Sequence, residues 1–311
     1  MRNIYQSILK EQSGIAMVLV ALCMFMIIGF TALVVDVGGL YFEKSRLQKA
    51  VDSAVLGGAQ VLKVSESAAE NTGIELALDN GFTVVVEEVD TGANFIEIHK
   101  TVSKELTFAR VLGINQTNVS ATARAETLQT LIAGDGIIPV AIEQGDYSAG
   151  EPYTMHFQAG NPNNSSVSGN FGFLAIDGPG GNDLKEGIIN GSTMEVSEDK
   201  LEWTKTGLSW GNVKEGFQTR IDQDADIINC QSYETADNTC SRVVTVPIVE
   251  TFVDSTGKTL VRIIGFAAFW IEDVVPNGND KAVVGRFIDY VRGGTFGAGE
   301  NYGIYGVKLV N

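Results

Sequence analysis

One uninterrupted apolar run, Ile15 to Val35, constrains this chain more than any other feature of its sequence. The run is 21 residues long without a charge, and as an α-helix it would measure about 31 Å, close to the hydrocarbon thickness of a bilayer. A cleavable secretory signal has a shorter apolar core and a small-residue cleavage site after it. Here the sequence DVGG follows at residues 36–39. The run therefore predicts an uncleaved transmembrane helix over residues 15–35.

A helical pattern continues beyond the apolar run. Apolar and small residues recur in steps of three and four up to Leu62, with charged residues between them, which predicts an amphipathic helix over residues 36–62. Ala50, Ala54 and Gly58 form a ridge of small residues at four-residue spacing, and such a ridge lets another helix approach closely. That helix is either a partner's, a second copy's, or the next helix of the same chain.

The order of residues around this helix is distinctive. Ser13-Gly14 precedes the apolar run, Asp36-Val37-Gly38-Gly39 ends it, and RLQKAVDSA follows at residues 46–54. Over residues 13–60 the chain resembles the N-terminal signature of TadE/TadG-like proteins of the tight-adherence (Flp) pilus-assembly system. The resemblance implies a single-pass protein of the cytoplasmic (inner) membrane, with residues 1–14 in the cytoplasm and the bulk of the chain periplasmic or extracellular.

The resemblance also implies a role and a set of partners. The role is assembly or anchoring of an adhesive pilus. The partners are other pilus-assembly membrane proteins or pilin-like helices, including a second copy of this chain, with the lipid bilayer around residues 15–35.

Charges beside the apolar run do not decide its orientation. Arg2 and Lys10 precede it, whereas Lys44, Arg46 and Lys49 follow it, so the basic residues alone slightly favour the opposite orientation. Long domains cross membranes largely regardless of charge. The cytoplasmic N-terminus is therefore an expectation from the resemblance, with support from the cysteine pair described below.

Gly14 stands where prepilin peptidases cut pilin-type leaders, directly before the apolar run. Such leaders typically have a glutamate five residues into the mature chain, and here that residue is Leu19. We expect no cleavage.

Residues 63–127 predict a small α+β unit that resembles a pilin head in outline. The pattern gives helices and strands in alternation. The expected elements are a helix at Ser67–Asn80, strands at Phe82–Val89, Phe95–Val102 and Val119–Arg124, and a short helix within Lys104–Leu112.

A linker at residues 128–136 and a β-rich domain at residues 137–311 complete the expected α+β architecture. Strands joined by Gly and Asn turns dominate this domain. Strands are expected at Tyr153–Phe157, Phe171–Ile176, Arg242–Val253, Leu260–Ile271, Ala282–Val291 and Tyr302–Val310, with short helices at Asp183–Asn190 and Val213–Asp222.

The net charge excludes one class of partner. The formal charge is −16, and residues 1–35 hold only Arg2, Lys10 and Glu11 among the charged residues. The rest of the chain is therefore strongly acidic and would repel nucleic acid and anionic lipid headgroups. An acidic surface of this kind mostly keeps a protein soluble.

Two of the three cysteines lie close together in the sequence. Cys230 and Cys240 flank a polar loop, whereas Cys23 lies within the apolar run. Either the pair forms a disulfide, as an oxidising compartment allows, or the thiols are unlinked; we favour the disulfide. Two cysteines and two distant histidines cannot make a zinc site.

Two motifs suggest chemistry. The sequence GLSWG at residues 207–211 fits the pattern of a hydrolase nucleophile elbow, but His99 and His156 lie upstream and no apolar strand precedes it. Asp222, Asp224 and Asp226 space three carboxylates like the start of a calcium loop, but Ile227 and Tyr233 stand where an EF-hand needs Gly and Glu. We interpret the first as a turn and the second as a solvated loop, with calcium as its alternative.

The sequence therefore predicts no enzyme and no cofactor. The leading hypothesis is a membrane-anchored component of pilus assembly. The alternatives are a surface adhesin or ligand-binding module on a membrane anchor, and a pilin-like subunit incorporated into a filament.

Overall fold

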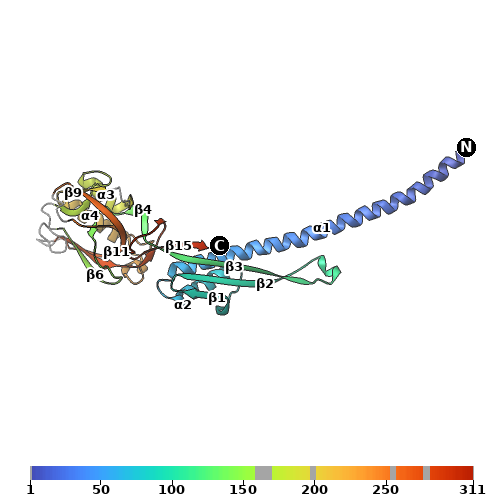
Figure 1. Ribbon diagram of the computed structural model, residues 1–311, viewed down its shortest axis with the longest axis horizontal. Helices are drawn as coiled ribbons and strands as arrows, with labels where there is room; N and C mark the ends of the chain where they lie inside the picture. The colour runs from blue at the N-terminus through green and yellow to red at the C-terminus, as the bar shows by residue number, and fades with distance from the viewer. Residues whose placement is uncertain (1, 158–169, 197–200, 253–256, 276–280, 311) are drawn as a thin grey trace.

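The computed structural model describes residues 2–157, 170–196, 201–252, 257–275 and 281–310. One long helix, α1 (Arg2–Val61), projects from a proximal unit of helices and strands, and a larger β-rich distal unit lies at the other end of the molecule (Figure 1). The predicted α+β class with a β-rich distal part is confirmed.

Helix α1 contains both segments predicted to be helical, and it runs through them without a break. Its 60 residues include no proline, so nothing removes a backbone donor from the helix interior. At about 1.5 Å per residue the helix is roughly 90 Å long. Only its C-terminal part, from Leu47 onward, is buried against the proximal unit.

Helix α2 (Glu66–Asp79), which corresponds to the helix predicted at Ser67–Asn80, turns back along α1. The hydroxyl of Ser65 accepts a hydrogen bond from the backbone N–H of Ala68 at 3.0 Å, which satisfies one of the free donors at the helix start. Gly81, with a φ of +87°, reverses the chain after the helix.

The proximal sheet has five strands among the described residues, in the order β1-β2-β3-β15-β13. All its pairs are antiparallel except β13 with β15. The strands are β1 (Val89–Gly92), β2 (Phe95–Glu105), β3 (Gln116–Gln129), β13 (Tyr290–Val291) and β15 (Ile304–Val310).

Small residues on β3 let α1 lie close to this sheet. The buried side chains alternate along the strand, and three of the five are alanines. Ile96 and Ile98 of β2 complete the layer beneath the helices, and both are fully buried. The buried apolar residues of α1, and Leu62 directly after it, recur in steps of three and four: Leu47, Ala50, Val51, Ala54, Val55, Ala59 and Leu62.

Two of the predicted proximal elements are wrong. Residues 82–85 form no strand; a short 3-10 helix, η1 (Val86–Glu88), follows them, because Glu88 closes a turn by accepting a hydrogen bond from the backbone N–H of Val85. The helix expected within Lys104–Leu112 shrinks to a 3-10 turn, η2 (Ala109–Leu112). The reason is that β2 continues to Glu105, where it still pairs with β3.

The distal sheet contains ten strands among the described residues, with the central path β14-β4-β10-β11-β12-β6. The remaining strands branch from it, β5 on β10, β8 on β4, β9 on β11 and β7 on β9. The strands are β4 (Leu131–Ile137), β5 (Ile142–Glu143), β6 (Pro152–His156), β7 (Asn170–Leu174), β8 (Ser192–Glu195), β9 (Leu201–Thr206), β10 (Val243–Val249), β11 (Leu260–Val275), β12 (Ala282–Phe287) and β14 (Thr295–Phe296).

Alternation along β10 and β11 divides the distal interior into two cores. Val244 and Phe269 face a core that includes residues of the helices α3 (Gly181–Asn190) and α4 (Trp210–Gln223). Val243 and Trp270 face the other core, which holds Cys230 and Cys240. Since every residue of β10 is buried, this strand lies at the centre of the unit.

Most of the predicted distal elements are present, although the strands β4, β5, β8, β9 and β14 were not predicted. The run Ala282–Val291 is divided between β12 and β13, which belong to different sheets. Of the run Arg242–Val253, Val253 lies outside the described residues.

Residues 128–136 do not form the predicted linker. They contain the end of β3 and most of β4, with Thr130 at a φ of +65° as the single residue between the two strands. The last strand, β15, also departs from the predicted division, because it pairs with β3 in the proximal sheet. The segment assigned to the distal domain thus ends within the proximal sheet.

Candidate functional site

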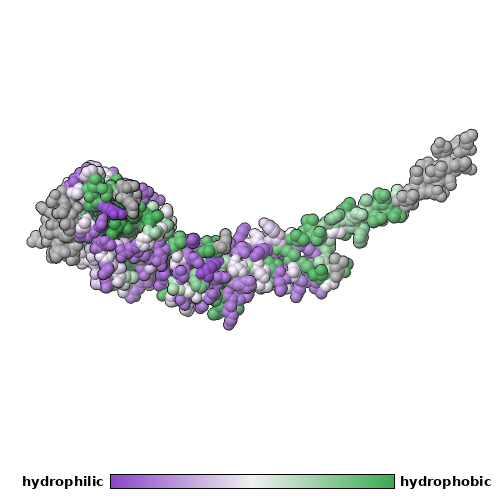
Figure 2. All heavy atoms as spheres, viewed as in Figure 1, coloured by the Kyte–Doolittle hydropathy of each residue, from purple (hydrophilic) through white to green (hydrophobic). Residues whose placement is uncertain are grey.

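The exposed part of α1 is the most unusual surface of the molecule. Within its most apolar 18-residue window no residue is buried, and this is the one helix among the described residues that is long and apolar enough to cross a membrane. Phe25 is 78% exposed and Val34 69% exposed. Figure 2 shows this continuous hydrophobic surface along the projecting helix. Such a surface is unstable in water, and it fits a single-pass membrane anchor.

The ridge of Ala50, Ala54 and Gly58 is occupied within the chain itself. Ala50 and Ala54 are buried. A methyl group added at Gly58 would lie 2.6 Å from Cδ1 of Ile96 and 2.8 Å from the backbone oxygen of Ala69. Of the two readings of the ridge, packing against the chain's own α2 and sheet is therefore the one observed. A partner helix cannot reach it in this fold.

Asp36, at the end of the apolar run, holds the far end of the β2–β3 hairpin. Its carboxylate accepts hydrogen bonds from the backbone N–H groups of Thr107 at 2.7 Å, Phe108 at 3.0 Å and Ala109 at 2.7 Å. Ala109 is the first residue of η2 and the other two donors precede it directly; η2 has no side-chain cap of its own. The contact joins residues more than 70 positions apart, and no sequence pattern indicated it beyond the position of Asp36 after the run.

The side chains around Asp36 form an open, apolar groove between α1 and the hairpin. Its lining from the hairpin comprises Leu106, Phe108, Ala109 and Val111. From α1 it comprises Phe25, Ile28, Gly29, Ala32, Leu33, Asp36, Val37 and Leu40. Asp36 is the one charged residue in this lining, so the groove is suited to an apolar occupant.

Polar contacts further along α1 fix the hairpin to the helix. Lys44 donates a hydrogen bond to the backbone oxygen of Ser120, and Gln48 donates one to that of Thr122 at 2.9 Å. Glu43 forms an ion pair with Lys104 at 3.6 Å. The hairpin therefore contacts α1 at several positions along the helix. The contact at Asp36 is the one nearest the N-terminus of α1.

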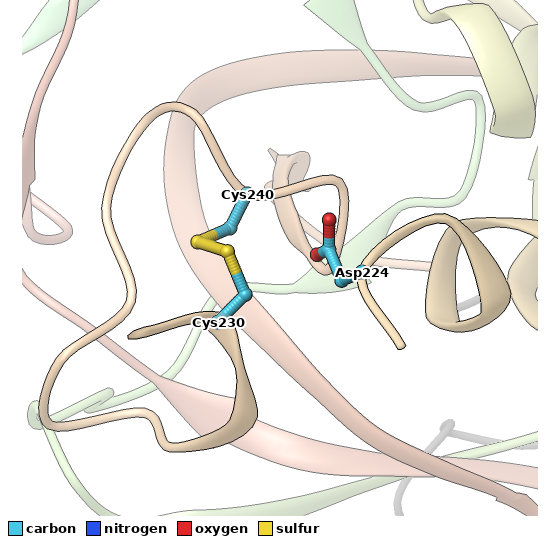
Figure 3. A group of neighbouring side chains, drawn as sticks. All are labelled: Asp224, Cys230 and Cys240. Carbon is cyan, nitrogen blue, oxygen red and sulfur yellow. A yellow bond between two sulfur atoms is a disulfide. The ribbon is translucent and has the colours of Figure 1, made fainter. Parts of the chain in front are cut away.

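In the distal unit Cys230 and Cys240 are bonded as a disulfide, with their Cα atoms 5.5 Å apart. The Asp224 carboxylate lies beside the sulfur atoms (Figure 3). It accepts hydrogen bonds from the backbone N–H groups of Ser241 at 3.0 Å and Arg242 at 2.7 Å. Because the disulfide leaves no thiolate to ligate a metal, this cluster is a structural clamp on the loop.

The three aspartates of the calcium alternative do not converge. Asp224 is buried in the contacts just described, while Asp222 is paired on the surface of α4 with Gln218 at 2.9 Å. Asp226 is exposed, and among the described residues it joins no group of carboxylates, histidines and cysteines at ligand spacing. Asp222 lies in the last turn of α4, which ends at Gln223, whereas Asp224 and Asp226 follow the helix, so the three residues do not share one loop.

The GLSWG sequence does lie between a strand, β9, and a helix, α4, but β9 has the sequence LEWTKT and is not the apolar strand of a nucleophile elbow. Ser209 has a φ of +39°, and its hydroxyl accepts a hydrogen bond from Lys205 at 2.9 Å. Burial lowers the pKa of the Lys205 ammonium, against the opposing attraction of Asp183. His99 is bonded to Thr122 of β3. Among the described residues no hydrogen bond joins Ser209 to a histidine, so the Ser–His contact of an elbow-type triad is not formed.

A polar pocket of about 420 Å³ opens beside the disulfide loop, lined in part by Arg220, Thr245, Tyr290 and Arg292. Arg220 donates to the backbone oxygen of Ser241 at 2.8 Å. Burial lowers the pKa of its guanidinium to about 10, although the nearby Asp224 acts in the opposite direction. Two guanidinium groups on one pocket could bind an anionic or hydroxyl-rich ligand.

Fold and site together define a protein whose single apolar helix projects from a helix-on-sheet proximal unit that carries a β-rich distal unit. Residues 14–61 match the family model described as "Putative Flp pilus-assembly TadE/G-like". The predicted TadE/TadG-like identity of the N-terminal segment is thereby confirmed, and the matched residues lie entirely within α1. No curated protein matched in a search. A search of solved structures also found no match.

Proposed function

We propose that this chain is a membrane-anchored, non-catalytic component of Flp/Tad-type pilus assembly. The observation that carries the proposal is the coincidence of the TadE/G-like match, residues 14–61, with a helix that is apolar and exposed in its N-terminal part and packed in its C-terminal part. The N-terminus lies in the cytoplasm, and α1 crosses the cytoplasmic (inner) membrane once. Both folded units lie on the periplasmic or extracellular side.

The disulfide and the charge support this topology. A Cys230–Cys240 bond is expected outside the reducing cytoplasm. The strongly acidic exterior suits a soluble unit held away from anionic headgroups, and it disfavours nucleic acid as a partner.

The proposed partners are other pilus-assembly membrane proteins, pilin-like helices or a second copy of this chain. Since the ridge at Ala50, Ala54 and Gly58 is covered within the fold, a partner helix would meet the exposed part of α1. That part includes Cys23, which is free and exposed. A disulfide cross-link through Cys23 would report a second copy packed there.

Deletion of the gene in its host tests the proposal. Surface pili and adherence should be lost, and the wild-type gene should restore both. The variant Ile27→Arg/Ile28→Arg should fail to do so, because each arginine at the centre of a span opposes insertion by roughly 3 kcal/mol. The matched control is Leu78→Arg/Val86→Arg, which places the same charges at exposed sites of the proximal unit. Unchanged pili in the deletion strain would contradict the proposal.

One observation favours a second candidate, a surface ligand-binding module. The pocket with Arg220 and Arg292 is a polar concavity that the pilus proposal does not use. A glycan or anion array probed with the full chain tests it, with Arg292→Met as the variant expected to abolish binding. If wild type and variant bind alike, the pocket is not the site.

A third candidate, a pilin-like filament subunit, is favoured by the apolar part of α1 that projects beyond the proximal unit. Mass spectrometry of the mature N-terminus separates it from the first candidate. A chain that begins at Ile15 would mean that Gly14 is a cleavage site, despite Leu19 at the fifth position.

A further inference from the structure

The tip of the β2–β3 hairpin exposes apolar side chains at the end of a strand pair that is otherwise polar on its outer face. Val111 is 88% exposed, Ile114 52% and Phe108 40%. The tip is well formed, because backbone hydrogen bonds join Leu106 to Asn115 at 3.0 Å and Ile114 to Ala109 at 3.1 Å. A structured loop with three large apolar groups in water needs an apolar environment to cover them.

The tip lies beside the apolar part of α1. The groove between them extends along α1 from Leu40 back to Phe25, which is about 16 Å on the N-terminal side of Asp36 along the helix axis. The part of this stretch from Phe25 to Leu33 lies within the segment of α1 proposed to cross the membrane. Figure 2 shows the hydrophobic surface of the helix continuing onto the adjacent end of the proximal unit.

The charges at this level are already paired. The carboxylate of Asp36 accepts hydrogen bonds from three consecutive backbone N–H groups of the tip. Arg110 is ion-paired with Glu105. Groups paired in this way are less costly to bring to the edge of a low-dielectric layer than free charges are.

The tip is also held at a fixed height relative to α1. Lys44 and Gln48, which follow Asp36 along α1, also attach β3 to the helix through hydrogen bonds. A bilayer that surrounds residues 15–35 must therefore meet the tip as well.

We propose that the hairpin tip, residues 106–114, inserts into the non-cytoplasmic leaflet as a second membrane contact, and that lipid acyl chains fill the groove between the tip and α1. This inference rests on the proposed insertion of α1. Two contact points on different elements would fix the tilt of the whole molecule relative to the membrane, which a single helix crossing does not.

Depth-dependent fluorescence quenching tests the proposal on the full chain in lipid vesicles. A bimane label on Val111→Cys, in a Cys23→Ala background with the disulfide kept oxidised, is exposed to lipids with brominated acyl chains. The same label on Ile114→Cys gives a second reading. Val64→Cys is the matched control, since Val64 is also a valine, 79% exposed, in the turn between α1 and α2. Native Cys23, labelled in the otherwise unaltered chain, reports the insertion of α1.

The proposal predicts several-fold stronger quenching by bromolipid at positions 111 and 114 than at position 64, with the reverse order for aqueous iodide. Strong lipid quenching at Cys23 together with iodide quenching at 111 and 114 would overturn the hairpin proposal and leave the membrane anchor intact. The absence of lipid quenching at Cys23 would overturn both.

Discussion

At the residue scale, Asp36 connects the membrane-facing and folded parts of the chain. Its carboxylate provides the acceptors for the first backbone donors of η2, a task that a cap residue normally performs from within the same segment. Here the acceptor comes from a distant helix. Among the contacts between α1 and the hairpin, Asp36 makes the one that holds the tip directly.

Substitution of Asp36 by alanine should release the tip. The N–H groups of Thr107, Phe108 and Ala109 would lose their acceptor, so their hydrogen exchange should become faster, while the rest of β2 stays protected. Hydrogen exchange followed by mass spectrometry or NMR checks this. Glu43→Ala is the control, because Glu43 contacts the hairpin only through its 3.6 Å ion pair with Lys104. Equal exchange at residues 107–109 in wild type and Asp36→Ala would contradict the assignment.

Glu88 should give the proximal unit a dependence on acid. Burial acts to raise the pKa of Glu88, but the hydrogen bonds from Lys100 and from the backbone N–H of Val85 outweigh it and lower the pKa below the ordinary 4.5. A carboxyl with a lowered folded-state pKa stabilises the fold above its unfolded-state value. That contribution disappears as the pH falls from 4.5 through the folded-state pKa.

The variant Glu88→Gln should therefore be less stable than wild type at pH 7 and should approach it below about pH 4. Thermal unfolding of the full chain at several pH values measures the difference. A difference in melting temperature between the two proteins that increases as the pH falls would refute this assignment.

At the scale of elements, α1 and the proximal sheet fit together through small residues. Gly58 has Ile96 and the backbone of Ala69 against it, and alanines on β3 face the same helix. Gly58→Leu should destabilise the proximal unit by about 1–3 kcal/mol through overpacking. Gly39→Leu is the matched control, since nothing lies within 4 Å of a Cβ there. Chemical denaturation in detergent, with near-UV circular dichroism as readout, should separate the two.

The disulfide should stabilise the distal unit. Cys230 and Cys240 are ten residues apart, and closing a loop of that size is worth about 3 kcal/mol in the chain-entropy model. Cys230→Ser/Cys240→Ser should lower the melting temperature and make it insensitive to reductant. Cys23→Ala should leave both unchanged. If the double variant has the same melting temperature as the wild type, the Asp224 contacts alone hold the loop.

The elements that sequence patterns predicted are those with strong periodicity and clear limits. The helices α1 and α2 and the strand β2 fall into this group, because their apolar spacing is a local signal. The strand β9 was missed, since its sequence LEWTKT alternates little. The valines before η1 were misread as a strand, because a side-chain turn at Glu88 overrides their β-propensity.

Contacts between distant segments could not be predicted in this way. The spacing of Ala50, Ala54 and Gly58 indicated a surface for the close approach of another helix, but the sequence could not say which element would cover it. The hairpin contact of Asp36 and the groove beside it also join segments far apart in the chain. No local sequence pattern indicates the Asp36 contact or the groove.

At the scale of the whole molecule, the chain passes between its two units and returns. It leaves the proximal sheet at the end of β3 through Thr130, and it comes back as β15 along the same strand. Tyr302 and Ile304 belong to the distal cores just before that return. Because β13 also lies in the proximal sheet, between β12 and β14 of the distal sheet, the distal unit is attached through several crossings, which the prediction of a linker at residues 128–136 did not include.

The account depends on α1 crossing a membrane with both units on the far side. Labelling of single cysteines in intact spheroplasts with a membrane-impermeant maleimide tests this most directly. In a Cys23→Ala background, Val64→Cys lies just after α1 and Ser7→Cys lies near its start. We predict that residue 64 reacts in intact cells and that residue 7 reacts only after lysis. Reaction of residue 7 in intact cells, or of residue 64 only after lysis, would contradict the account.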